Sequence, residues 1–107
     1  MGKTVINPSI KKGSWITLSG NCYYRIVNDI CYLYGYSGGT TIIQTTLTNL
    51  CTLPSNARPT QAMWGALTNR GALTAGYVQV DNTSGVVSAC ANAATGYWAF
   101  AISFPIG

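Results

Sequence analysis

The amino-acid sequence predicts an all-β domain, and three observations lead to that prediction. Thr, Val, Ile, Tyr and Trp dominate the apolar segments, and these residues favour strands over helices. Gly, Asn, Ser and Pro recur roughly every 8–15 residues, the spacing of turns in a sandwich or barrel. The chain has 107 residues and a mass of 11.3 kDa, which suits one domain. We therefore expect a jelly-roll-like antiparallel β-sandwich of about eight strands.

The strand pattern divides the chain into a short arm and one head domain. Residues 1–13 contain Asn7-Pro8 and Gly13 and are interpreted as an N-terminal arm or linker, and residues 14–107 as the β-sandwich head. The expected strands are 15–18, 22–27, 30–36, 42–53, 61–68, 73–81, 86–91 and 97–104.

The clearest local unit is a hairpin between the second and third strands. Asn28-Asp29 forms a plausible two-residue turn, because both residues tolerate positive φ better than most. The resulting register pairs Val27 with Ile30, Arg25 with Tyr32 and Tyr23 with Tyr34. One face carries Cys22, Tyr24, Ile26, Cys31 and Leu33 and is the expected core face.

The opposite face of this hairpin is too apolar for a freely solvated sheet. It carries Tyr23, Arg25, Val27, Ile30, Tyr32 and Tyr34. Either loops of the other sheet or another subunit must cover it, and we favour another subunit. The expected interface residues are Tyr23, Val27, Ile30, Tyr32 and Tyr34.

The last strand has one large apolar face and one face of small residues. Trp98, Phe100, Ile102 and Phe104 alternate with Ala99, Ala101 and Ser103. The small face would either allow another backbone to approach closely or form a tightly packed second core layer.

The four cysteines are expected to be reduced. In the hairpin register Cys31 lies four residues along the strand from the position opposite Cys22, a separation of about 13 Å. A disulfide requires Cα atoms within about 7 Å, which excludes the Cys22–Cys31 pair. With no Cys-x-x-Cys motif and no His, the cysteines are interpreted as small hydrophobes rather than metal ligands.

Composition argues against several classes of function. The chain contains no His and no Glu, and its two acids, Asp29 and Asp81, lie at predicted turns or strand ends, so we expect no enzyme and no cofactor. A net charge of +4 comes from scattered basic residues, which argues against a nucleic-acid partner. No apolar run is long enough for a membrane-spanning helix or a signal peptide.

Several short motifs occur in an order that resembles the C-terminal domains of bacteriophage tail-fibre and baseplate proteins. Those domains commonly show a Tyr-Arg … Asn-Gly … Val-Tyr-Leu … Gly hairpin, then Thr-Leu-Pro … Arg-Pro, Gly-Tyr-Val-x-Val and Ile-Ser-Tyr-Pro-Ile. The matching residues are Tyr24-Arg25, Asn28 to Gly35, Leu53-Pro54, Ala57-Arg58-Pro59, Gly76 to Val80, Gly85-Val86-Val87 and Ile102 to Ile106. The similarity covers roughly residues 14–107 and departs from the pattern at Asp29, where Gly is usual, and at Ser55-Asn56-Ala57.

This resemblance implies a homotrimeric head at the tip of a phage or prophage-derived adhesion device. Such a protein is made in the bacterial cytoplasm, becomes part of the virion tail, joins the remainder of a fibre or baseplate and binds saccharide on the host surface. The alternative is a purely structural cap that trimerises without a ligand.

Exposed aromatic rings beside planar polar groups are the residue types that bind a sugar. Tyr36 leads into the loop 37–39, and Asn69 and Arg70 occupy another expected loop, with Trp64 on the strand before it. These four residues are the candidate ligand-binding residues. The competing interpretation places the aromatic residues in the core or in the trimer interface.

Overall fold

A computed structural model describes residues 14–70 and 75–106, and these form one antiparallel sheet of eight strands. A short 3₁₀ turn, η1 (Ser55–Ala57), precedes the fifth strand. The strands are β1 (Ile16–Thr17), β2 (Cys22–Val27), β3 (Ile30–Tyr36), β4 (Thr48–Thr52), β5 (Met63–Asn69), β6 (Ala75–Val80), β7 (Val86–Ala91) and β8 (Trp98–Pro105). The all-β prediction and the expected number of strands are confirmed for the described residues. The expected arm, residues 1–13, lies outside them.

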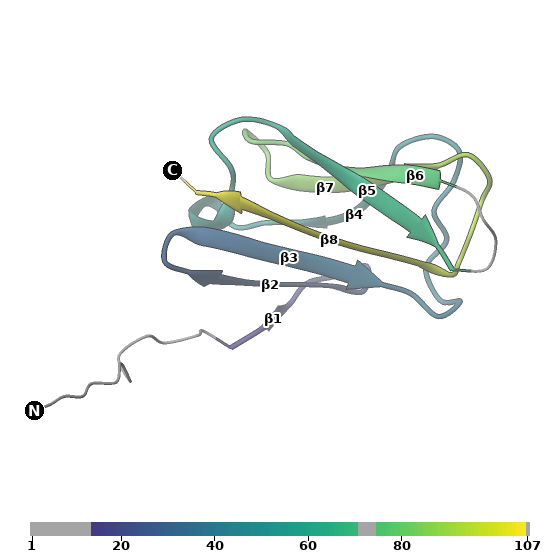
Figure 1. Ribbon diagram of the computed structural model, residues 1–107, viewed down its shortest axis with the longest axis horizontal. Coiled ribbons are helices and arrows are strands. Elements are labelled where there is room, and N and C mark those ends of the chain that lie inside the picture. The colour runs from purple at the N-terminus through teal and green to yellow at the C-terminus, as the bar shows by residue number, and fades with distance from the viewer. Residues whose placement is uncertain (1–13, 71–74, 107) are drawn as a thin grey trace, which may run out of the picture.

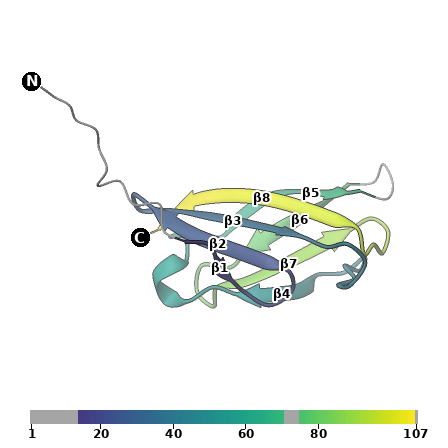
Figure 2. The same ribbon diagram turned by 90° about the horizontal axis from the view of Figure 1, so that it is seen from below.

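The strands follow the order β1-β2-β3-β8-β5-β6-β7-β4 across the sheet. The sheet curls into a half-barrel, so that β3, β8 and β5 run side by side in Figure 1, while β8 and β4 lie on opposite sides of the molecule in Figure 2. Curling brings the two halves of the sheet face to face around a shared core, as in a β-sandwich.

The hairpin between β2 and β3 has the predicted register. Val27 pairs with Ile30, and the ladder continues to Cys22 and Gly35 without a slip. Asn28 and Asp29 have φ angles of 53° and 63°, so both occupy the left-handed region that a type I′ turn requires. The turn residues and the alternation of side chains therefore specify this unit locally.

The concave face of the sheet holds the core. Trp98, Phe104 and Leu33 are its largest fully buried side chains, and the indole Nε1 of Trp98 donates a hydrogen bond of 2.8 Å to the carbonyl of Thr41. Of the expected core residues on the hairpin, four are buried and Ile26 packs against the cluster from its margin.

The expected strand 42–53 is wrong in its first half, because β4 begins only at Thr48. The Thr48 hydroxyl donates to the carbonyl of Thr46 and accepts from the amide of Gln44, each at 3.1 Å. Such local side-chain bonds compete with a strand ladder. Ile43 keeps an isolated bridge to Thr95 and is fully buried.

The two ends of the curled sheet meet along a seam between the β1–β2 connection and β4. A β-bulge between Asn49 and Cys51 leaves Leu50 outside the ladder with β7, and the Leu50 carbonyl accepts a hydrogen bond of 3.1 Å from the Ser19 hydroxyl. Gly20, at φ 65°, packs so closely that a Cβ there would collide with the Leu50 carbonyl oxygen. A side chain at position 20 would therefore force the seam apart.

Candidate functional site

The convex face of β2 and β3 carries a strip of aromatic rings. Tyr23 and Tyr34 stack with centroids 5.0 Å apart, Tyr36 continues the stack at 6.3 Å from Tyr34, and Trp15 contacts Tyr34 edge-on at 4.7 Å. Directly opposed residues of adjacent strands place these rings within reach of each other. The rings hold one another in fixed positions, so this face is already ordered in the single chain.

We call the five predicted interface residues the tyrosine face: Tyr23, Val27, Ile30, Tyr32 and Tyr34. The structure brings them together on the convex side, with Tyr32 exposed and the others half-buried. Part of their cover comes from within the chain, because Trp15 packs on Tyr34 and the guanidinium of Arg25 lies 4.4 Å from the centroid of the Trp15 ring. This part of the cover comes from the residue before β1 rather than from the loops of another sheet.

A groove of about 430 Å³ runs beside the tyrosine face along β8. Tyr32, Tyr34 and Trp15 line one part, and Ala101 and Ser103 line another. Both β8 residues are exposed, so the small face of this strand is not a second core layer. The groove forms because these small side chains lie beside the larger aromatic rings.

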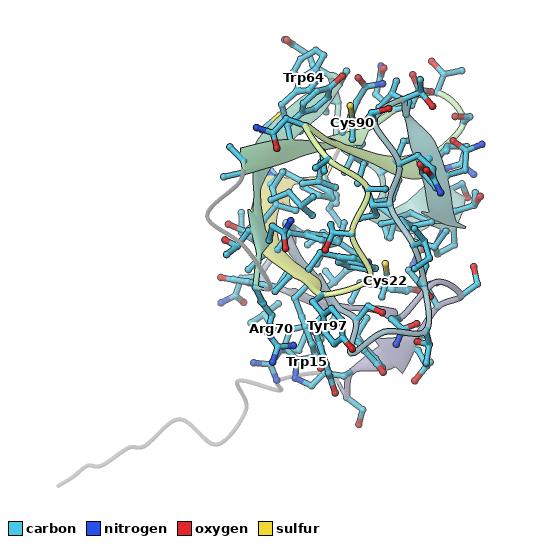
Figure 3. The ribbon with its side chains drawn as sticks, turned by 90° about the vertical axis from the view of Figure 1, so that its right-hand side faces the viewer. Trp15, Cys22, Trp64, Arg70, Cys90 and Tyr97 are labelled. Atoms are coloured by element: carbon cyan, nitrogen blue, oxygen red, sulfur yellow. The ribbon has the colours of Figure 1, made fainter. Side chains whose placement is uncertain are left out.

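A second aromatic surface lies on β5 and β6, and we call Trp64, Tyr77 and Gln79 the tryptophan patch. Trp64 is 59% exposed, and its indole Nε1 donates a hydrogen bond of 3.0 Å to Oε1 of Gln79, its direct partner across the ladder. Tyr77 is 39% exposed and pairs with Ala66. In Figure 3, Trp64 projects from the opposite side of the molecule to Trp15.

The tryptophan patch borders a shallow hollow of about 430 Å³. Tyr77 forms one part of its lining, together with Thr45, Cys90 and Asn92. The Cys90 thiol donates to the carbonyl of Thr45 at 3.3 Å, which ties the segment before β4 to β7. The patch therefore combines two exposed rings and an amide beside a hollow that includes the polar side chains of Thr45 and Asn92.

The four ligand-binding candidates do not form one site. Tyr36 belongs to the stack of rings on β2 and β3. Trp64 and Arg70 are six residues apart along the chain, which separates them by about 20 Å in an extended strand. Arg70 is exposed at the far end of β5, where its amide bonds to the Tyr97 carbonyl.

Asn69 is the candidate whose position differs most from the expectation of a loop residue. It is the last residue of β5, only 9% exposed, and its Oδ1 accepts a hydrogen bond of 3.0 Å from the Thr95 hydroxyl. Its amide therefore holds β5 to the connection before β8 in the interior.

Sequence reasoning missed Trp15, Tyr77 and Gln79 as surface residues. Gln79 could have been found by pairing the two strands of the β5–β6 hairpin, because that register places it opposite Trp64. Trp15 could not have been found from strand pairing, because its contact with Tyr34 depends on how the chain before β2 turns back over the sheet.

Arg58 and Asp81 serve the fold rather than either surface. Arg58 donates to the carbonyls of Leu53 and Thr83 at 3.0 and 2.7 Å. Asp81 accepts from the amide and hydroxyl of Ser84 and from the amide of Thr83; these bonds, with Arg58 nearby, keep the pKa of Asp81 below its usual value. Arg58 therefore anchors its loop by bonding to backbone carbonyls.

Within residues 14–70 and 75–106 there is no group of three or more His, Cys, Asp or Glu side chains placed to hold a metal ion. In the same ranges no helix has the length and apolar character needed to cross a membrane. No protein-family model matches the chain, and a search of curated proteins finds no match.

Proposed function

We propose that this chain is the receptor-binding head of a phage or prophage-derived tail fibre or baseplate, and that it binds a host-surface saccharide without catalysing a reaction. The observation that carries the proposal is the exposed Trp64 ring, held in place by the Gln79 amide. The resemblance of residues 14–107 to tail-fibre C-terminal domains supports the biological setting. A jelly-roll-like topology and a homotrimer complete the proposal.

The chemistry of the tryptophan patch favours a saccharide over other ligands. A pyranose ring presents a face of C–H groups and an edge of hydroxyl groups, so it needs an aromatic surface beside hydrogen-bonding groups. Trp64 supplies the surface, and Gln79 uses only its Oε1 on the indole, which leaves the two N–H donors of the amide for sugar hydroxyls. Thr45 and Asn92 in the adjoining hollow provide further polar groups.

The division between the two aromatic surfaces follows from the side chains that surround the rings. The tyrosine face consists of apolar side chains beside a groove with small residues on β8, which suits a second copy of the chain. Trp64 projects from the opposite side of the molecule to Trp15, which packs on Tyr34, in Figure 3, so association through the tyrosine face leaves Trp64 open to solvent.

An array of bacterial surface polysaccharides, comprising lipopolysaccharide O-chains, capsules and wall polysaccharides, tests this function directly. We expect the chain to bind one polysaccharide class, and the Trp64→Ala variant to bind it at least tenfold more weakly. Gln79→Glu keeps the acceptor for the indole but removes the N–H donors, so it should also weaken binding.

The matched control is Tyr97→Ala, which removes a similarly exposed aromatic ring from the loop before β8 and should leave binding unchanged. Equal binding by wild type and Trp64→Ala would contradict the assignment of the patch. Absence of binding to every polysaccharide on the array would favour the alternative, a structural cap without a ligand.

A further inference from the structure

Two of the four thiols meet in the interior at the seam. Cys22 begins β2 and Cys51 lies in β4, and they are 0% and 6% exposed. The Cys22 thiol donates to the carbonyl of Gly20 at 3.5 Å, and the Cys51 thiol is near enough to raise the pKa of Cys22. Figure 3 shows Cys22 pointing into the interior between the layers.

Three features of the backbone hold these thiols together. The bulge in β4 places Leu50 and Cys51 consecutively in the interior, the Ser19 hydroxyl bonds to the Leu50 carbonyl at 3.1 Å, and Gly20 packs against the same carbonyl. The backbone before Cys22, at Gly20, therefore contacts the backbone before Cys51, at Leu50. A disulfide needs Cα atoms within about 7 Å, and the contact of Gly20 with Leu50 brings the neighbouring Cys22 and Cys51 backbones toward that separation.

We propose that Cys22 and Cys51 form an intramolecular disulfide when a low-molecular-weight disulfide such as oxidised glutathione is supplied. This bond would join β2 to β4 and lock the seam. The thiolate of one cysteine attacks glutathione disulfide and releases one glutathione thiolate, which takes up a proton. The second cysteine thiolate then displaces the attached glutathione, so two protein thiols are oxidised and one glutathione disulfide is reduced to two glutathiones. This inference goes beyond the proposed function and does not depend on it.

The environment of the pair makes the reaction slow but the product durable. The hydrogen bond with Cys51, followed by burial, raises the pKa of the Cys22 thiol far above its usual value, so little thiolate is present at neutral pH. Burial also means that the reagent reaches the sulfurs only when the seam opens locally. The rate should therefore rise with pH and with mild denaturant.

The other cysteines provide internal controls. Cys31 lies opposite Ile26 in the hairpin, four residues along β3 from the partner of Cys22, and burial raises its pKa to about 11. Cys90 is half-buried on β7 and bonds to the Thr45 carbonyl. All four cysteines are free thiols in the structure, so the disulfide is a second state rather than the one described.

The experiment uses the full chain, reduced and then incubated with oxidised glutathione at pH 8. After unfolding, free thiols are alkylated and counted by mass spectrometry, and the cross-linked peptide is fragmented to identify the bonded cysteines. We expect two alkylated thiols, a Cys22–Cys51 cross-link, and a midpoint of thermal unfolding higher by roughly 10 °C that returns to its first value with dithiothreitol. Four alkylated thiols, a different cysteine pair or stable glutathione adducts would overturn the proposal.

Two variants separate this pair from the alternatives. Cys31→Ala should keep the cross-link and the thermal shift, whereas Cys51→Ala should lose both and retain all three remaining thiols. If Cys51→Ala does not fold, the fragment spectrum of the wild-type cross-link decides the pairing alone. Saccharide binding is not used as a readout, so this test and that of the proposed function fail independently.

Discussion

Arg58 illustrates how a charged residue in this chain acts through the backbone. Its guanidinium bonds to the carbonyls of Leu53 and Thr83, and Gly85 packs against it so closely that a Cβ there would collide with Nε. Gly85 has a φ of 77°, so glycine is favoured there both for space and for conformation. Arg58, the turn before β7 and the end of β4 therefore form one unit.

Replacing Arg58 by Ala should lower the free energy of unfolding by about 1–2 kcal/mol, because two carbonyls lose a charged donor. Urea denaturation measures this as a lower midpoint with an unchanged slope. Arg70→Ala is the matched control and should stay within about 0.5 kcal/mol of wild type, because the Arg70 side chain is exposed. Equal midpoints for Arg58→Ala and wild type would contradict the anchoring role.

The lowered pKa of Asp81 predicts how the free energy of unfolding changes with pH. Its pKa in the folded chain is lower than its usual value, so its contribution to stability is fully present above about pH 5 and is lost as the pH falls through the folded pKa. Asp81→Asn keeps an acceptor but no charge. The difference in free energy of unfolding between wild type and Asp81→Asn should be constant from about pH 7 to 5 and shrink below about pH 4.

Urea midpoints at a series of pH values test this expectation. The same exchange at the hairpin turn, Asp29→Asn, is the control that tests whether the effect belongs to Asp81. A difference between wild type and Asp81→Asn that persists or grows toward about pH 2.5 has the wrong sign for a lowered pKa and would refute the assignment.

At the scale of elements, the β2–β3 hairpin was predictable and the start of β4 was not. The turn at Asn28-Asp29 and strict alternation fix the hairpin from neighbouring residues. The start of β4 depends instead on the Thr48 hydroxyl capturing backbone groups, which apolar patterning does not reveal.

The candidate sites were less predictable than the strands, because each combines residues from different hairpins or layers. The interior position of Asn69 depends on Thr95, 26 residues away, and the pairing of Cys22 with Cys51 depends on the curling of the whole sheet. Trp64 is exposed, as the ligand-binding hypothesis requires and the core hypothesis does not, and its neighbours follow from the register of β5 and β6.

The hairpin turn gives a prediction at the element scale. Asp29 has a φ of 63°, where a residue with a Cβ is strained, and the tail-fibre pattern usually has Gly at this position. Asp29→Gly should raise the free energy of unfolding by about 0.5 kcal/mol, since relief of strain exceeds the added entropy of the unfolded chain.

Asp29→Ala provides the opposing variant for the same measurement. It places a Cβ without a side-chain acceptor in the left-handed region and should lower the free energy of unfolding by about 1 kcal/mol. In chemical denaturation, Asp29→Gly should be the most stable protein, wild type the next and Asp29→Ala the least stable. If Asp29→Ala were more stable than Asp29→Gly, the type I′ turn would be contradicted.

At the scale of the whole molecule, the surface is poor in charge. The chain has eight charged residues, and three of them, the lysines, precede residue 14. The described residues therefore carry only Arg25, Arg58, Arg70, Asp29 and Asp81. A surface with so few charges has little to keep copies apart when exposed aromatic rings meet.

We expect the chain to associate through the tyrosine face. Three chains of 11.3 kDa weigh about 34 kDa, which light scattering at micromolar concentration should detect. Tyr32→Glu places a charge beside the groove and should reduce the mass toward that of one chain. Tyr77→Glu makes the same change at an equally exposed tyrosine of the tryptophan patch and should leave the mass unchanged.

The outcomes distinguish association from its stoichiometry. A wild-type mass near 11 kDa would refute association, and a mass of about 23 kDa would refute only the trimer. A Tyr77→Glu variant that dissociates while Tyr32→Glu does not would move the interface to the other side of the molecule.

The seam also determines how copies of this domain can and cannot polymerise. The outermost strands of the sheet are β1, with two residues, and β4, which contains a bulge, and both shapes are poor templates for strand addition by a neighbour. The Ser19–Leu50 hydrogen bond further occupies a carbonyl that an incoming strand would use. Growth of an endless intermolecular sheet is therefore disfavoured, so a crowded array of these domains can remain a set of discrete particles even though each carries few charges.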